Sequence, residues 1–212
     1  MFSKIAATLS LASAAVATGV SITPHDAYSS SIGVLGCLID VNRVAYWPMQ
    51  PDCNNLCKRV TANGRTVNLL QIDTSGGAYD ISYDAWNYLN VGASATDQPT
   101  MGGGIPAEFE DAPMSECASI IKTPDGKLPL MAANSINTYV GCPAGSWLHD
   151  NSALYNIQTS GCKYGYNEVC TLDLAVSNQP SCPHQLGAQN PLSGMDVMNI
   201  QYGTGALVAS PI

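Results

Sequence analysis

The sequence predicts a mainly β, disulfide-rich domain that the cell exports. Short apolar runs alternate with segments rich in Gly, Pro, Asn and Ser, and only 11% of the 212 residues are charged. This texture is typical of short strands joined by many turns. The chain also has eight cysteines, and its first residues have the composition of a secretory leader. Together these observations point to a fold that is stabilised in an oxidising compartment.

The leader is expected at residues 1–17. Lys4 precedes an uncharged run, residues 5–20, that is rich in Ala and Leu. A basic start followed by an apolar stretch defines a signal peptide, and this stretch is short for a transmembrane helix of about 20 apolar residues. Ala15 and Ala17 present small side chains where a signal peptidase reads them. We therefore expect cleavage after Ala17 and a secreted, extracellular protein.

All eight cysteines follow this cut. In an exported chain an even number indicates four disulfides, although eight cysteines permit 105 pairings. Four lie on each side of a turn at residues 123–126, so each half could close two bridges of its own. A zinc site is the competing interpretation, but the Cys and His spacings do not suit one. We expect no metal and no other cofactor. The cysteines are Cys37, Cys53, Cys57, Cys117, Cys142, Cys162, Cys170 and Cys182.

The net charge of the chain makes several classes of binding partner unexpected. The net charge is −8, and such a surface repels phosphate backbones, anionic lipids and anionic pectin. Nucleic acid is therefore not an expected partner, and neither is a membrane once the leader has been removed. A polysaccharide or an extracellular host protein stays compatible with the charge, and we expect a monomer.

The local patterns predict several strands and one helix. Residues 57–60 and 66–72 flank Asn63 and Gly64, a favoured hairpin turn because both positions tolerate positive φ. Tyr83, Trp86 and Leu89 share one face of a helix that Ser82 begins and Gly92 ends. This face predicts a core position for Trp86. Further strands are expected at 34–39, 43–47, 79–82, 107–109, 155–158, 198–202 and 206–209.

The order of features in residues 57–92 carries a family resemblance. A strand, an Asn-Gly turn, a strand ending in Asp73 and a glycine loop lead into Tyr79-Asp80-Ile81-Ser82 and the helix. This order resembles the double-psi β-barrel shared by expansins, barwin-like proteins and a class of barrel endoglucanases. The whole chain is also similar to small secreted fungal proteins.

The resemblance implies a six-stranded double-psi β-barrel with short helices at residues 31–121. Residues 18–30 are polar and turn-rich, so we expect a flexible lead-in there. Residues 122–212 are expected to form a disulfide-tied, β-rich extension or a second subdomain.

The resemblance also implies candidate catalytic residues. Asp80 matches the general acid of the barrel endoglucanases. The expansins have His-Phe-Asp at this place, whereas here Ala78 and Tyr79 precede Asp80, so the histidine is absent. The second carboxylate of the hydrolases follows an aromatic pair, and here Pro48 follows that pair. Inverting hydrolysis needs two carboxyl groups about 6.5–9.5 Å apart. Asp73 is the other acidic candidate, with capping of backbone amides as its alternative role.

Four residues are candidates for binding a ligand: Tyr46, Trp47, Tyr79 and Asp80. A flat aromatic ring suits the apolar face of a pyranose. The alternative is that the aromatic residues belong to the core, although in a strand one of Tyr46 and Trp47 has to point outward.

We therefore expect a secreted expansin-like or barwin-like protein. It is expected to be non-catalytic, and either to bind cell-wall polysaccharide or to act as a host-directed effector. One alternative is a glycoside hydrolase or lytic transglycosylase that acts through Asp80. The other is a protease inhibitor or another protein-interaction module, which the disulfide density would suit.

Overall fold

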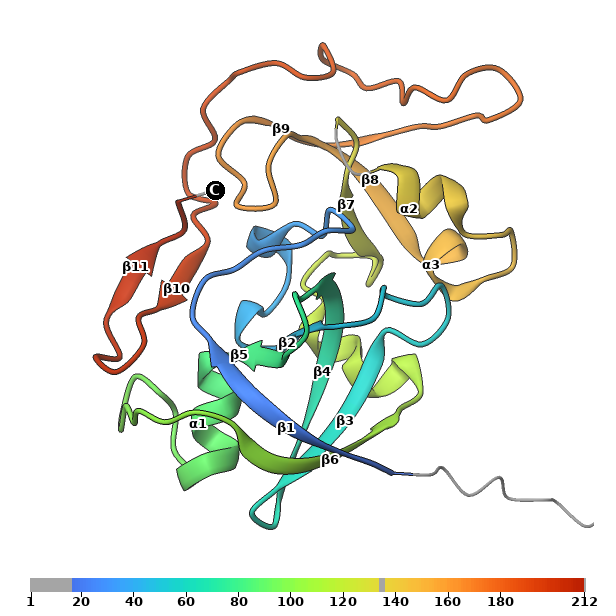
Figure 1. Ribbon diagram of the computed structural model, residues 1–212. Coiled ribbons are helices and arrows are strands. Elements are labelled where there is room, and N and C mark those ends of the chain that lie inside the picture. Colours follow the sequence, from blue (N-terminus) through green and yellow to red (C-terminus); the bar gives the residue numbers. More distant parts are fainter. Residues whose placement is uncertain (1–16, 134–135, 212) are drawn as a thin grey trace, which may run out of the picture.

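The computed structural model describes residues 17–133 and 136–211, so the proposed leader lies outside the described residues except for Ala17. Six strands close into a barrel in the order β1-β5-β2-β4-β3-β6 (Figure 1). They are β1 (Thr18–His25), β2 (Val44–Trp47), β3 (Cys57–Ala62), β4 (Arg65–Thr74), β5 (Tyr79–Ser82) and β6 (Ile105–Asp111).

The barrel is of mixed type. The pairs β1/β5 and β2/β4 are parallel, and the other four neighbouring pairs are antiparallel. Parallel partners need crossover connections, which explains why the order in the barrel differs from the order along the chain. The prediction of a mainly β protein built on a six-stranded barrel is confirmed.

The expectation of a flexible lead-in at residues 18–30 is wrong for its first part. Residues 18–25 form β1, which pairs with β5 on one side and β6 on the other and so closes the barrel. Its polar composition misled the prediction, because the strand alternates the buried Ile22 with exposed positions such as Ser21. The barrel therefore begins at Thr18 and not at residue 31.

The predicted hairpin and helix are both present. Asn63 and Gly64 have φ values of 49° and 73° in the turn between β3 and β4. Helix α1 (Tyr83–Val91) ends at Gly92, whose φ of 85° is the left-handed conformation typical of a helix C-cap. Asn63 and Arg65 donate side-chain hydrogen bonds to the carbonyl oxygen of Leu89. The hairpin turn thereby satisfies the C-terminal end of α1, whose Trp86 is fully buried as predicted.

The predicted strand at 34–39 is wrong. This segment contains the 3-10 helix η1 (Gly36–Leu38), with only single bridges from Val34 to Leu130 and from Ile39 to Ile121. Gly36 lies so close to Tyr28 and Val197 that an added Cβ would be 2.8 Å and 2.9 Å from their side chains. Close packing with distant residues therefore overrides the local strand propensity.

The other elements lie outside the barrel. A three-stranded sheet, in the order β7-β8-β9, and a β10-β11 hairpin lie in residues 122–211, which we call the C-terminal part (Figure 1). No described helix has the length and apolar character needed to cross a bilayer. These elements are η2 (Val41–Arg43), η3 (Met114–Ile120), β7 (Leu128–Met131), α2 (Ile136–Gly141), α3 (Trp147–Asp150), β8 (Ser152–Ile157), β9 (Gly165–Cys170), β10 (Met198–Ile200) and β11 (Leu207–Ala209).

All eight cysteines form disulfides, as predicted, but each half does not close two bridges of its own. Two bridges join the halves, one joins β3 to η3, and one closes a loop in the C-terminal part. The pairs are Cys37–Cys162, Cys53–Cys142, Cys57–Cys117 and Cys170–Cys182.

The buried apolar side chains form two clusters. One fills the barrel and includes Trp47, Ile81 and Trp86. The other includes Tyr46 from β2 together with Tyr155 from β8. The C-terminal part therefore packs on the outer side of the barrel, and residues of both parts form this second cluster.

Candidate functional site

The barrel separates the predicted ligand-binding residues into two groups. Along β2, Trp47 belongs to the cluster inside the barrel and Tyr46 to the cluster outside it, as alternation along a strand requires. Trp47 is fully buried and Tyr46 is 4% exposed. Both are core residues, so the expectation that either ring stacks directly on a sugar is wrong. The partly exposed Tyr79 and Asp80 remain candidates.

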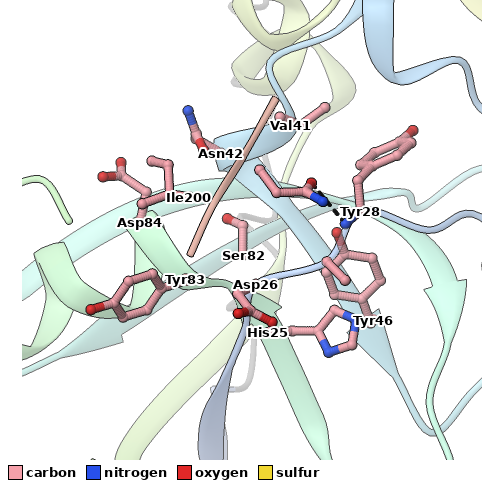
Figure 2. Close-up of a pocket in the computed structure, with 12 residues that line it drawn as sticks. His25, Asp26, Tyr28, Val41, Asn42, Tyr46, Ser82, Tyr83, Asp84 and Ile200 are labelled. Atoms are coloured by element: carbon pink, nitrogen blue, oxygen red, sulfur yellow. Dashed lines mark hydrogen bonds between the residues drawn. The ribbon is translucent and has the colours of Figure 1, made fainter. Parts of the chain in front are cut away.

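Asp80 lies on the outer face. It faces Tyr46 on β2 and Thr23 on β1, and the Thr23 hydroxyl donates a hydrogen bond to its carboxylate. The ring of His25, two residues further along β1, is centred 4.6 Å from the ring of Tyr46 (Figure 2). The structure thus gives Asp80 a histidine on the same face, although no histidine precedes it in the sequence.

Asp73 reaches the same face through an irregularity in β4. The register shifts between Ala45 and Tyr46, so that Tyr46 pairs with Asp73 while Ala45 pairs with Gln71. Such a bulge re-aims a side chain. Asp73 then accepts hydrogen bonds from the Ser29 hydroxyl and from the backbone amides of Ser31 and Thr74, the latter two at 3.0 and 2.7 Å.

These bonds make Asp73 a structural residue that holds the segment after β1 against the end of β4. Three donors satisfy its carboxylate, so it is not free to activate a water molecule. The alternative role considered for this residue, the capping of backbone amides, is the one that the structure supports.

Asp73 and Asp80 do not form an open catalytic pair. They lie on the two strands that flank β2, which places their backbones roughly 10 Å apart. Tyr46 lies between them and is 4% exposed. Burial raises the pKa of Tyr46, so its hydroxyl stays protonated. The space that inverting hydrolysis needs for a water molecule and a glycosidic oxygen is therefore filled.

A small cavity lies beside this face at the start of α1. Its volume is about 10 Å³, which is room for roughly one water molecule. Ser82 lines it and occupies the predicted N-cap position, but its buried hydroxyl makes no hydrogen bond to protein (Figure 2). The cavity is too small for a sugar or a cofactor.

Asp84, beside the same cavity, holds α1 to η2. Its carboxylate accepts hydrogen bonds from Arg43 at 2.8 Å, from the Ser94 hydroxyl at 2.7 Å and from the Ala95 amide at 2.8 Å. Burial by itself would raise the pKa of Asp84, but these three donors outweigh it, and the pKa is lowered from its ordinary value. Asp84 is thus a structural anion.

An aromatic cluster at one end of the barrel is the best candidate surface. It consists of Trp47, Tyr79 and Phe109. The Trp47 ring lies 5.5 Å from Tyr79 and 4.4 Å from Phe109, and these two rings lie 5.8 Å from each other. Tyr79 and Phe109 are partly exposed while Trp47 is buried beneath them.

Lys58 borders the aromatic cluster. Its ammonium group lies 5.8 Å from the centre of a Trp47 ring and forms an ion pair with Asp111. The sequence analysis identified Tyr79 but missed Phe109, which comes from β6. The signal that could have found it is the strand prediction at 107–109, but pairing with β1 and β3 is what brings this ring to Trp47.

The sequence matches no protein-family model and no curated protein. Among solved structures, cerato-platanin 3 from M. perniciosa is similar to part of the chain. The TM-score is 0.34 at 12% sequence identity, and the match covers 47% of this chain and 98% of the cerato-platanin chain. The barrel is established by its own strand order.

Proposed function

We propose that the protein is secreted and binds an uncharged cell-wall polysaccharide, without cleaving it, through the aromatic cluster. The observation that carries this proposal is the partly exposed pair of Tyr79 and Phe109 resting on a buried Trp47. Rings that are held in place by packing lose little conformational freedom when a sugar stacks on them. The net charge of −8 favours uncharged glycans over anionic ones.

Two features support an extracellular location. The described residues contain four disulfides and no free cysteine, which is typical of proteins that fold in an oxidising compartment. The apolar run at residues 5–20 has the composition of a secretory leader. N-terminal sequencing of the protein from culture medium would test this part of the proposal, with Thr18 as the expected first residue.

Binding to insoluble chitin and cellulose tests the site. Tyr79→Ala is expected to weaken binding about fivefold, because one aromatic contact contributes about 1 kcal/mol. The matched control is Tyr164→Ala, which removes a tyrosine that is 41% exposed in the C-terminal part. Equal effects of the two variants would exclude the aromatic cluster. If the wild-type protein binds neither polysaccharide, the proposal fails and an extracellular host protein becomes the better candidate partner.

Hydrolysis through Asp80 has a test of its own. Without an open partner carboxylate, Asp80→Asn is expected to leave the release of reducing sugars from these polysaccharides at the background rate of the wild type. A measurable wild-type activity that disappears in the Asn variant would overturn the non-catalytic proposal. Thermal unfolding of both proteins would show that the comparison is made between folded chains.

A further inference from the structure

A second surface, which adjoins the aromatic cluster at Phe109, lies on the outside of β1, β6 and β3. Two adjoining hollows of about 620 and 220 Å³ share Thr61 and Glu108 and together run along β6 from Pro106 to Glu110. They form one shallow groove, which we call the β6 groove. With β1 and β3 on either side of β6, the groove is roughly 10 Å wide.

The groove is open because β1 contributes almost no side-chain volume to it. On β1 the groove is lined by Gly19, by Ser21 and by Val20, whose side chain packs against the cluster inside the barrel. Gly19 has no positive φ, and a Cβ added there would meet nothing within 4 Å. The fold therefore does not require glycine at this position, where a strand favours β-branched residues. Glycine inside a strand marks a bulge, a tight bend or the close approach of a ligand or another backbone, and the pairing of β1 with β6 runs through Gly19 without a bulge.

One carboxylate at the centre of the groove is unpaired. Glu108 lies opposite Gly19 on β1 and opposite Thr61 on β3. Its neighbour Glu110 forms an ion pair with Arg59, which also binds Glu116. Among the described residues, the side chain of Glu108 has neither a hydrogen bond nor an ion pair. The groove thus places the unpaired carboxylate of Glu108 near the hydroxyl groups of Ser21 and Thr61 and beside the open space at Gly19.

We propose that the β6 groove binds a cationic amino-sugar polymer, a glucosamine chain with free amines. A pyranose ring fits over Gly19, its ammonium group pairs with Glu108, and its hydroxyl groups bond to Ser21 and Thr61. The net charge of −8 attracts such a chain and repels uronic acids.

A basic peptide would also carry the right charge, but the groove suits it less well. An extended peptide gains affinity by pairing with a free strand edge. The strands under the groove have no free edge, because β6 pairs with both β1 and β3 in the closed barrel. A sugar chain does not depend on such pairing, because its hydroxyl and ammonium groups bond to side chains.

Titration of the full protein with a fully deacetylated glucosamine hexamer at mildly acidic pH tests the proposal. Glu108→Gln is expected to weaken binding about fivefold, the value of an exposed ion pair. Gly19→Val is expected to weaken it further by filling the groove, and it should fold because valine suits a strand and meets no neighbour. Asp97→Asn is the matched control, since it removes an exposed charge elsewhere.

Three outcomes would overturn this inference. Gly19→Val could bind like the wild type, Asp97→Asn could weaken binding as much as Glu108→Gln, or a lysine hexamer could displace the sugar from the groove. The groove is distinguished from the aromatic cluster by Gly19 and Glu108, which line the groove and do not belong to the cluster. An N-acetylated hexamer should bind Glu108→Gln as well as it binds the wild type.

Discussion

The barrel and the C-terminal part are held together by different means. Every barrel strand has two hydrogen-bonded neighbours, and large buried side chains such as Trp47 and Trp86 fill the interior. The C-terminal part has a three-stranded and a two-stranded sheet, and it exposes apolar residues such as Val176 and Leu207, at 81% and 59%. Three of the four disulfides involve it. Cross-links thus stabilise the region that buries less apolar surface.

The largest effect is expected from the longer of the two bridges that join the regions. Replacing both Cys37 and Cys162 by Ser opens a link across 125 residues and should cost about 4–5 kcal/mol. Limited proteolysis should then cut the C-terminal part first, while the barrel resists. The control replaces Cys170 and Cys182, which are 12 residues apart, and should cost about 3 kcal/mol. If the protease degraded both regions of the first variant at the same rate, the two regions would form one cooperative unit.

A substitution in the core tests whether buried side chains stabilise the barrel. Trp47→Ala should cost about 4 kcal/mol, because it leaves a cavity where a fully buried ring was packed. Urea unfolding followed by tryptophan fluorescence and far-UV circular dichroism would measure it. Leu207→Ala, which truncates a side chain that is 59% exposed on β11, should change stability by less than about 0.5 kcal/mol. Similar costs for the two variants would contradict the difference between the regions.

The smallest effect concerns pH. Asp84→Asn should cost about 2 kcal/mol at neutral pH, because charged hydrogen bonds to Arg43, Ser94 and Ala95 are weakened. The folded pKa of Asp84 is lowered from 3.8. Its contribution is therefore fully present above this ordinary value and is lost as the pH falls through the lowered pKa. Unfolding curves of the two proteins should converge in strong acid, and a gap that persists there would exclude the ionic origin.

Local signals in the sequence were sufficient for several elements. Asn63 and Gly64 adopt the positive φ values that the hairpin turn needs, and Gly92 ends α1 in the left-handed conformation. These outcomes depend on residues close together in the chain. The prediction failed at residues 18–25 and 34–39, because the barrel pairing of the first segment and the close packing around Gly36 involve distant partners.

The candidate surfaces also combine residues that the sequence identified with an arrangement that depends on distant partners. The sequence identified Tyr79 and Asp80 as candidates for binding a ligand, but it named Tyr46 and Trp47 with them. Alternation along β2 buries Tyr46 and Trp47 on opposite sides of the strand. The bulge in β4 turns Asp73 toward Ser29 and Ser31. Neither outcome can be predicted from one strand, because each depends on the register with a neighbour.

Composition and cysteine number depend on no tertiary contact, and they were enough to predict a mainly β, acidic protein with four disulfides. The sequence also determined the hairpin and α1, whose turn and cap residues act locally. Long-range packing, in contrast, sets the cysteine pairing, the closure of the barrel by β1, the contact of Phe109 with Trp47 and the open space at Gly19. Each of these depends on which distant segments pair, and strand register, not local propensity, selects those partners.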